Sequence, residues 1–456
     1  ARSVTIGAVW PQIATILWIP SETTLMKILT QYTDEMVQMR RSIHQKPETG
    51  WTEFRTTALI VRRLKELGFN VLQGTAVINP DFVMGCYDTE VKLGISRALE
   101  AGISQKEIDA TGGYTGAVGI WETGRPGPVT ALRFDIDALY VPETQCSDHL
   151  PRQLGFASEY DGVMHACGHD CHAAIGLSLA HWIVDHANTL CGTIKLLFQP
   201  AEEGTRGARA MAESGIVDDV DILFASHIGC TPKLGFVTVT SPGYNATIKF
   251  DVSFTGKPAH SVANPQDGRN ALMGACHTAV MVGSLPRHGA GLTTVSCGKI
   301  VAGEMRNVVP VHANMQMEVR GATDELCQYM FEQVERCVKA NAQAFDLEYK
   351  VKKVGEALTM HPDEDLAKLI EHCAAEVVGA DHVDYYSERG GSEDVTILMK
   401  RVQSHGGKAA HFYYGADHNG QHRSDFDPDD VKSMPVGFTV QTKLIEATNG
   451  MNKTER

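Results

Sequence analysis

Residues 165–172 are His-Ala-Cys-Gly-His-Asp-Cys-His, and they lead directly into an apolar helix predicted from Ala173 to Ile183. Thiolate and imidazole are natural ligands of borderline divalent ions, and this short segment offers both. Such a segment is weak evidence when it stands alone, because cysteines and histidines are often simply buried. Its meaning therefore depends on what the rest of the chain places near it.

Two adjacent carboxylates follow about thirty residues later, in the segment Gln199-Pro-Ala-Glu-Glu-Gly204. They come directly after an apolar strand predicted over residues 193–198. Neighbouring side chains at a strand end point in different directions, so Glu202 and Glu203 can divide two tasks between them. One can bind a cation while the other transfers protons, which predicts a metal-dependent hydrolase.

A second acidic motif, Arg133-Phe-Asp-Ile-Asp137, ends another buried strand, predicted over residues 129–134. Strand alternation places Asp135 and Asp137 on the same side. A ligating histidine usually gives its second ring proton to a carboxylate, so one of these aspartates is a candidate orienting residue. A strand-end cap or turn aspartate is the alternative interpretation.

Further candidates have structural interpretations that stay open at this point. Asp170 can cap the following helix, and His165 and His172 can be packing residues of that helix and its approach. A single histidine at a strand end, such as His227, is more often structural than ligating. Together the strand ends nevertheless supply one thiolate, one carboxylate and three imidazoles, the number needed for a two-metal site: Cys167, Glu203, His169, His227 and His422.

Composition narrows the class of protein. The 456 residues are too many for one ordinary core, so two domains are expected, and the net charge of −14 argues against a nucleic-acid partner. An acidic substrate would need a local basic pocket inside this negative field. The 11 scattered cysteines suit a reducing cytoplasm, and no apolar run approaches the ~20 residues of a membrane helix.

Residues 1–25 are apolar, with prolines at 11 and 20. They lack the basic start and the small-residue cleavage site of a signal peptide. Whether they belong to the native protein or whether Met26 begins it stays open, and we exclude them from fold reasoning.

The predicted elements indicate an α/β protein with a mixed, largely parallel sheet. Apolar strands alternate with helices in residues 26–242 and again in 357–456, which we expect to form one catalytic domain in two parts. Residues 243–356 instead follow the order β-α-β-β-α-β, which predicts an inserted ferredoxin-like unit. The helices expected in the two catalytic parts cover residues 26–43, 52–67, 170–187, 205–214, 363–378 and 393–404.

The chain resembles the metallo-aminoacylase/carboxypeptidase family, which includes carboxypeptidase G, hippurate hydrolase and the auxin-conjugate amidohydrolases. The resemblance covers residues 35 to about 432 and rests on a collinear set of motifs. They are His44-Gln-Lys-Pro-Glu48, Phe134-Asp-Ile-Asp-Ala-Leu139, His165-Ala-Cys-Gly-His-Asp170, Pro200-Ala-Glu-Glu203, Pro258-Ala-His260, Arg306-Asn-Val-Val-Pro310 and Gly391-Ser-Glu-Asp394. Within the family, residues 198–211 and 217–221 resemble the branch that acts on p-aminobenzoyl-glutamate.

The resemblance implies roles for individual residues. Two divalent ions per chain would be held by Cys167 as a bridging thiolate, His169, Glu203, His227 and His422. Glu202 would be the general base, with Asp137 orienting the site. His260, Asn307 and Arg320 of the inserted unit would contact substrate, and His260 would stabilise the oxyanion across a dimer interface. The chain has Gln421 before His422, where this branch can have a second histidine.

The resemblance also implies a metal, a substrate and an assembly. Ligand softness suits Zn, but carboxylate and imidazole also suit Mn, and the resemblance favours Mn. The expected substrate is an N-acyl amino acid, foremost p-aminobenzoyl-glutamate, with indole-acetyl-aspartate as the alternative. The inserted unit would mediate a homodimer or pairing with a related B-type subunit. One rival hypothesis is a non-catalytic partner protein, but a scaffold needs none of these metal ligands. Another is a thiol nucleophile formed by Cys167 and His169, but it leaves the remaining ligands unexplained.

Overall fold

The computed structural model describes residues 32–230, 233–386 and 391–451. An eight-stranded mixed sheet with the strand order β1-β2-β4-β3-β5-β12-β6-β11 forms its larger part. The members are β1 (Asn70–Gln73), β2 (Ala117–Glu122), β3 (Val129–Asp135), β4 (Thr193–Gln199), β5 (Ile222–Ile228), β6 (Val237–Thr240), β11 (Val383–Tyr386) and β12 (Lys408–Tyr414). Four central strands, β4, β3, β5 and β12, are mutually parallel. The pairs β1–β2, β2–β4 and β12–β6 are antiparallel, and the edge strand β11 pairs parallel with β6.

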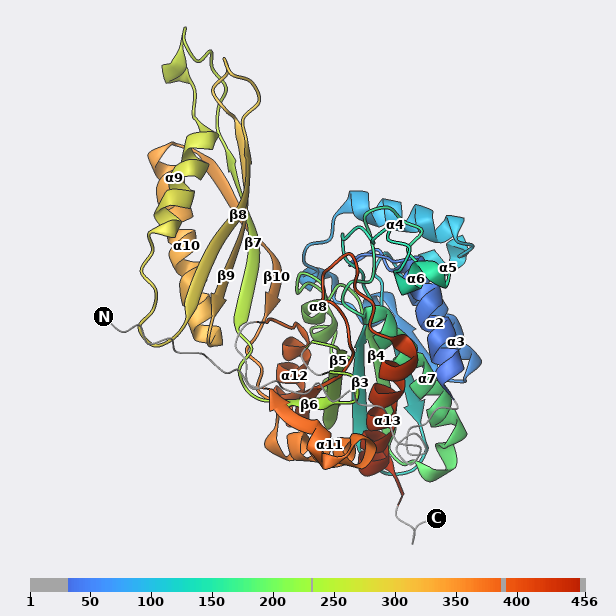
Figure 1. Cartoon of the computed structure of the whole chain (residues 1–456). Helices are drawn as coiled ribbons and strands as arrows, with labels where there is room; N and C mark the ends of the chain where they lie inside the picture. Colours follow the sequence, from blue (N-terminus) through green and yellow to red (C-terminus); the bar gives the residue numbers. More distant parts are fainter. Residues whose placement is uncertain (1–31, 231–232, 387–390, 452–456) are drawn as a thin grey trace, which may run out of the picture.

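Helices cover both faces of this sheet (Figure 1). One core cluster joins one face to α2 (Thr33–Gln45), α3 (Phe54–Glu66), α7 (His169–Asp185), α11 (Glu364–Val378) and α13 (Asp430–Asn449). A second cluster joins the other face to α8 (Ala208–Ala212) and α12 (Val395–Ser404). Because the central strands are buried on both sides, their sequences are mostly apolar on both faces rather than alternating between apolar and polar residues. Three further helices lie in the connections before and after β2 and β3: α4 (Asp88–Glu100), α5 (Gln105–Asp109) and α6 (Leu150–Gln153).

A separate four-stranded antiparallel sheet stands beside the larger one (Figure 1). Its elements follow one another as β7 (Ala246–Thr255), α9 (Ala271–Gly283), β8 (Thr293–Ala302), β9 (His312–Gly321), α10 (Asp324–Ala344) and β10 (Glu348–Ala357). The strand order is β10-β7-β9-β8, and α9 and α10 pack on one face through a core of their own. The other face is turned toward the larger sheet.

Several expectations from the sequence need correction. The helix expected over residues 205–214 is limited to α8, because Gly204, Thr205 and the turn around them hold a left-handed backbone. The first expected helix begins at Thr33 within the described residues, and residues 1–31 lie outside them. Helix α13 and strands β1, β6 and β11 were not predicted. Pro435 and Gly437 interrupt the helical pattern of α13, although the helix is almost wholly buried.

Among the described residues, no helix combines the length and the apolarity that crossing a bilayer requires.

Candidate metal-dependent active site

The carboxyl ends of parallel strands collect the candidate residues at one edge of the larger sheet. Strands β3, β4, β5 and β12 end at Asp135, Gln199, Ile228 and Tyr414, and the loops that follow carry the acidic and imidazole side chains. Open α/β sheets place functional groups at this edge. Sequence segments that lie far apart thus form one site.

Asp137 organises two parts of this site at once. Its carboxylate accepts the backbone N–H of Glu202 at 3.1 Å and of Glu203 at 2.9 Å, and it also contacts His169 Nδ1 at 3.1 Å. Only 1% of the residue is exposed. Asp137 therefore contacts the histidine and the backbone of both glutamates at once, a position that fits the orienting role that the family resemblance implies for it.

His169 is the first residue of α7, and its ring is positioned for a ligand. Nδ1 lies 3.1 Å from the Asp137 carboxylate, and the other ring nitrogen, Nε2, is buried without a hydrogen-bond partner. The preceding Gly168 has a φ of +92°, and a Cβ there would lie 2.4 Å from the Ile228 side chain. Glycine is thus required for the turn that starts the helix and aims His169.

His172 and His227 differ in which of their ring nitrogens are engaged by the protein. His172 donates to Asp135 through Nδ1 and accepts the Ile228 N–H at 2.9 Å through Nε2, so neither ring nitrogen is left for a metal. His227 donates from Nδ1 to its neighbour's carbonyl at 2.8 Å, leaving Nε2 facing the Cys167 Sγ at 3.5 Å. Ring orientation, which the sequence does not reveal, separates the two histidines.

Cys167, His169 and Glu203 bring their ligand atoms within 4.8 Å of one another. Burial raises the pKa of the Cys167 thiol well above its ordinary value, so a cation is what would favour the thiolate. Glu203 Oε1 is buried without a hydrogen-bond partner, and His422 Nε2 lies 3.5 Å from it. Orphaned buried acceptors beside a thiol fit a divalent metal.

Glu202 faces a different set of groups from Glu203. Burial raises its pKa well above the ordinary value, and the charges of Glu393, Glu203 and Asp394 raise it further. Burial also acts on Glu203, but His422 and His169 outweigh it, and the pKa of Glu203 is lowered. The two adjacent carboxylates thus sit in opposite electrostatic environments, which supports different roles.

A buried arginine lies behind Glu202. Arg133 contacts Asp135 at 2.5 Å, Glu393 at 3.0 Å and Asp394 at 3.1 Å, and its side chain is fully buried. Burial would raise the pKa of Asp135, but Arg133, His169 and His172 hold it well below its ordinary value. Arg133 therefore neutralises a carboxylate cluster next to the candidate base.

The remaining residues of the 165–172 segment have structural surroundings. Asp170 is not the N-cap of α7, which is Gly168, but its carboxylate accepts the first-turn N–H of Cys171 at 3.0 Å. It also accepts from Arg40 at 2.8 Å and contacts His44 Nδ1 at 2.7 Å in a buried network. His165 is buried without a partner at either ring nitrogen, and burial lowers its pKa to about 3.

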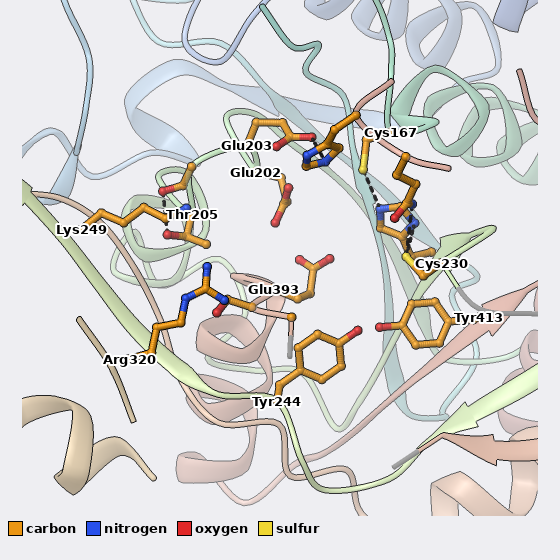
Figure 2. Close-up of a pocket in the computed structure, with 16 residues that line it drawn as sticks. Cys167, Glu202, Glu203, Thr205, Cys230, Tyr244, Lys249, Arg320, Glu393 and Tyr413 are labelled. Atoms are coloured by element: carbon orange, nitrogen blue, oxygen red, sulfur yellow. Dashed lines mark hydrogen bonds and ion pairs between the residues drawn. The ribbon is translucent and has the colours of Figure 1, made fainter. Parts of the chain in front are cut away.

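A cavity of about 410 Å³ opens onto these groups. Four predicted metal ligands line it together with Glu202 and Arg320: Cys167, Glu203, His227 and His422 (Figure 2). His169 lies behind this wall, fully buried. Tyr244, Lys249 and Glu393 also line the cavity, and sequence reasoning did not single them out as site residues. Two signals in the sequence could have identified two of them. Glu393 lies in the motif Gly391-Ser-Glu-Asp394, and the alternation of apolar and polar residues along β7 places Lys249 on the face away from the core.

His260 and Asn307 do not line the cavity. They lie together at the far end of the four-stranded sheet, where the Ser261 N–H donates to the Asn307 carbonyl at 3.1 Å. Arg320 pairs with Thr247 at one end of β7, and His312 pairs with Thr255 at the other. At ~3.3 Å per residue, the six steps along the strand from Lys249 to Thr255 alone span about 20 Å.

Comparisons with known proteins agree with this geometry. Residues 131–447 match the family model described as peptidase family M20/M25/M40. The chain is 43% identical over 415 residues to a Haemophilus influenzae protein named as a homolog of one of the subunits of p-aminobenzoyl-glutamate hydrolase, covering 91% of this chain and 98% of the relative. It is 40% identical over 430 residues to the indole-3-acetyl-aspartic acid hydrolase of Enterobacter agglomerans, covering 93% and 98%.

A solved structure is similar over nearly the whole length. It is the aminobenzoyl-glutamate utilization protein from Klebsiella pneumoniae, at 37% sequence identity and a TM-score of 0.78. The match covers 92% of this chain and 96% of that one.

Proposed function

The chain belongs to peptidase family M20/M25/M40 and is a hydrolase of amide bonds, and from this premise we propose that it cleaves an N-acyl amino acid with an aromatic acyl group. The foremost substrate is p-aminobenzoyl-glutamate, which would yield p-aminobenzoate and glutamate. One observation carries the proposal: the cavity places Arg320 in the same space as Glu202 and the thiol, carboxylate and imidazole groups. A guanidinium can grip a carboxylate in a bidentate fork.

Two divalent ions per chain are part of this proposal, with Mn favoured over Zn. Cys167 would bridge them, and the other ligands would be His169, Glu203, His227 and His422; the orphaned His169 Nε2 and Glu203 Oε1 support this set. When bound, such ions polarise a carbonyl and lower the pKa of water.

Glu202 would act as the general base and then the general acid. Its carboxylate takes a proton from water as the water oxygen attacks the amide carbonyl carbon. It returns that proton to the amide nitrogen as the C–N bond breaks, releasing the carboxylic acid and the amino acid. Asp137 would keep Glu202 in place through the backbone N–H of that residue.

The oxyanion donor would come from a second chain. His260 is exposed and lies far along β7 from its own cavity, which supports a role in a neighbouring chain's site. Asn307 lies beside it and would contact the same substrate. The loss of one such donor typically costs ~3 kcal/mol of transition-state stabilisation.

The architecture that this requires is a catalytic unit made of residues 26–242 and 357–456, with a ferredoxin-like lid of residues 243–356 that also mediates association. The β10-β7-β9-β8 order supports the ferredoxin-like topology, and the exposed edge strand β8 could be extended by a partner. The partner is a second copy or a related B-type subunit, since the name of the H. influenzae relative refers to one component of an enzyme with several. We place the protein in the cytoplasm on its cysteine content.

Hydrolysis of indole-acetyl-aspartate is the second candidate function, favoured by the E. agglomerans relative. The two candidates are separated by metal-reconstituted hydrolysis of a panel of p-aminobenzoyl, benzoyl and indole-acetyl conjugates of glutamate and aspartate. The highest kcat/KM is expected for p-aminobenzoyl-glutamate. Absence of hydrolysis across the panel in fully metallated protein would favour the rival hypothesis of a non-catalytic partner protein.

A further inference from the structure

Lys249 of β7 reaches the cavity from the four-stranded sheet. The burial pattern of β7 alternates, with Phe250 and Val252 in the core against the helices and Lys249 and Asp251 on the opposite face. The alternation of β9 places Arg320 on that same open face. Figure 2 shows Lys249 and Arg320 entering the cavity from one side, with Thr205 next to Lys249.

The neighbour that would be expected to neutralise Lys249 is engaged elsewhere. Glu318 lies directly opposite Lys249 in the ladder between β7 and β9. Its Oε1 instead accepts from Arg320 Nε and from Thr247 Oγ1. Within residues 32–230, 233–386 and 391–451, the Lys249 ammonium makes no hydrogen bond or ion pair, although the residue is half-buried.

A close backbone contact sets the position of Lys249 over the catalytic edge. Gly355 of β10 pairs with Lys249 at a bulge, and a Cβ on it would lie 2.1 Å from the Gly204 carbonyl oxygen. The next residue, Glu356, donates its N–H to the Thr205 carbonyl at 2.8 Å. Only glycine permits this approach, which fastens the strand beside Lys249 to the turn that follows Glu202 and Glu203.

The charges in the cavity are divided between two walls. Glu202, Glu203 and Glu393 lie on the catalytic side, and Lys249 and Arg320 lie on the other. A monocarboxylic amino acid needs one cation, which Arg320 can supply. A dicarboxylic amino acid needs two, and its second anionic group would reach Lys249, whose charge lowers the pKa of Glu203 but whose ammonium makes no hydrogen bond or ion pair among the described residues.

We propose that Lys249 binds the side-chain carboxylate of the substrate's amino acid, so that this residue selects dicarboxylic over neutral amino acids. This inference rests on the proposed function and deepens it. A charge-assisted hydrogen bond of this kind contributes ~1.5–3 kcal/mol, and a neutral side chain would leave the ammonium half-buried without a partner. The expected preference for glutamate over a neutral isostere is therefore about 10- to 100-fold.

The test compares three conjugates that share the p-aminobenzoyl group and differ in the amino acid: glutamate, glutamine and norvaline. Lys249→Met should lower kcat/KM for the glutamate conjugate by about 10- to 100-fold, mainly through KM, and change the other two by less than about 3-fold. Lys249→Arg should retain most of the preference. Lys350→Met is the matched control, because Lys350 is an exposed lysine of the same sheet.

Binding provides a readout that does not depend on turnover. Calorimetry of the metallated protein should show free glutamate binding more tightly than norvaline, and Lys249→Met should remove that difference. Equal losses for all three conjugates, or a wild-type protein without preference for glutamate in hydrolysis and binding, would overturn the role of Lys249 and leave the amidohydrolase proposal standing. Selective glutamate binding without hydrolysis would support Lys249 and contradict the proposed function instead.

Discussion

Replacing Arg133 by methionine tests whether one buried cation holds the catalytic edge together. The Arg133 guanidinium contacts Asp135, Glu393 and Asp394 within 3.1 Å and donates to Gln199 Oε1 at 2.8 Å, all without solvent exposure of its side chain. Methionine has similar bulk but no charge. The variant would therefore leave three neighbouring carboxylates without their cation.

The expected loss is about 3–5 kcal/mol of unfolding free energy near neutral pH, because removing one partner of a buried ion cluster strands the others. The loss should depend on pH. Burial raises the pKa of Asp394 to about 7 and also raises that of Glu393, so in the folded state both gain charge only as the pH rises. In the unfolded chain, carboxylates ionise near pH 4. Because the pKa values of Glu393 and Asp394 are higher in the folded state, the folded protein holds protons that the unfolded chain has lost, and the free energy of unfolding falls as the pH rises from about 4 to about 7. The penalty of Arg133→Met should accordingly be larger at about pH 8 than at about pH 5.5.

Urea unfolding followed by circular dichroism measures this difference. Arg401→Met is the control, since Arg401 also contacts two carboxylates, Asp218 at 2.7 Å and Glu213 at 3.2 Å, but its side chain is 27% exposed. An exposed pair contributes about 0–1 kcal/mol. Equal losses in the two variants, or a loss for Arg133→Met that does not grow with pH, would refute the reasoning.

Three further predictions concern catalysis. Glu202→Gln should retain its metals and lose about 10²- to 10⁴-fold in kcat, whereas Glu203→Gln should lose metal on dialysis; equal metal loss by elemental analysis would contradict the division of roles. Chelated protein refilled with Mn²⁺ should reach full activity at two ions per chain, and full activity at one ion would exclude the two-ion mechanism. Mixing inactive His260→Ala with inactive Glu202→Gln should restore part of the activity through shared sites. No recovery despite demonstrated exchange of chains would mean that His260 does not serve a neighbouring chain.

Much of the fold was predictable because its signals are local. Apolar runs predicted the central strands β3 and β4 to within a residue. Helix α13 escaped because Pro435 and Gly437 break the local pattern, and only packing against the core stabilises it. The short strands β6 and β11 escaped because four residues carry too little periodicity.

The sequence by itself determined which kinds of side chain stand at the strand ends, because motif and strand boundaries are local properties of the chain. It placed Cys167, Glu202 and Glu203 at that edge before any contact was known. It could not show that His169 has a ring nitrogen available to a metal and that His172 does not. That difference depends on hydrogen bonds to residues far away in the sequence, Asp137 for His169 and the Ile228 N–H for His172.

Only the tertiary structure decided which residues of the four-stranded sheet reach the cavity. Arg320 and Lys249 do so, whereas His260 lies at the far end of the same strands. The physical reason is the contact at Gly355, where the absence of a side chain lets β10 lie against the Gly204 carbonyl. Such a contact joins segments about 150 residues apart, and no local pattern in the chain encodes that distance.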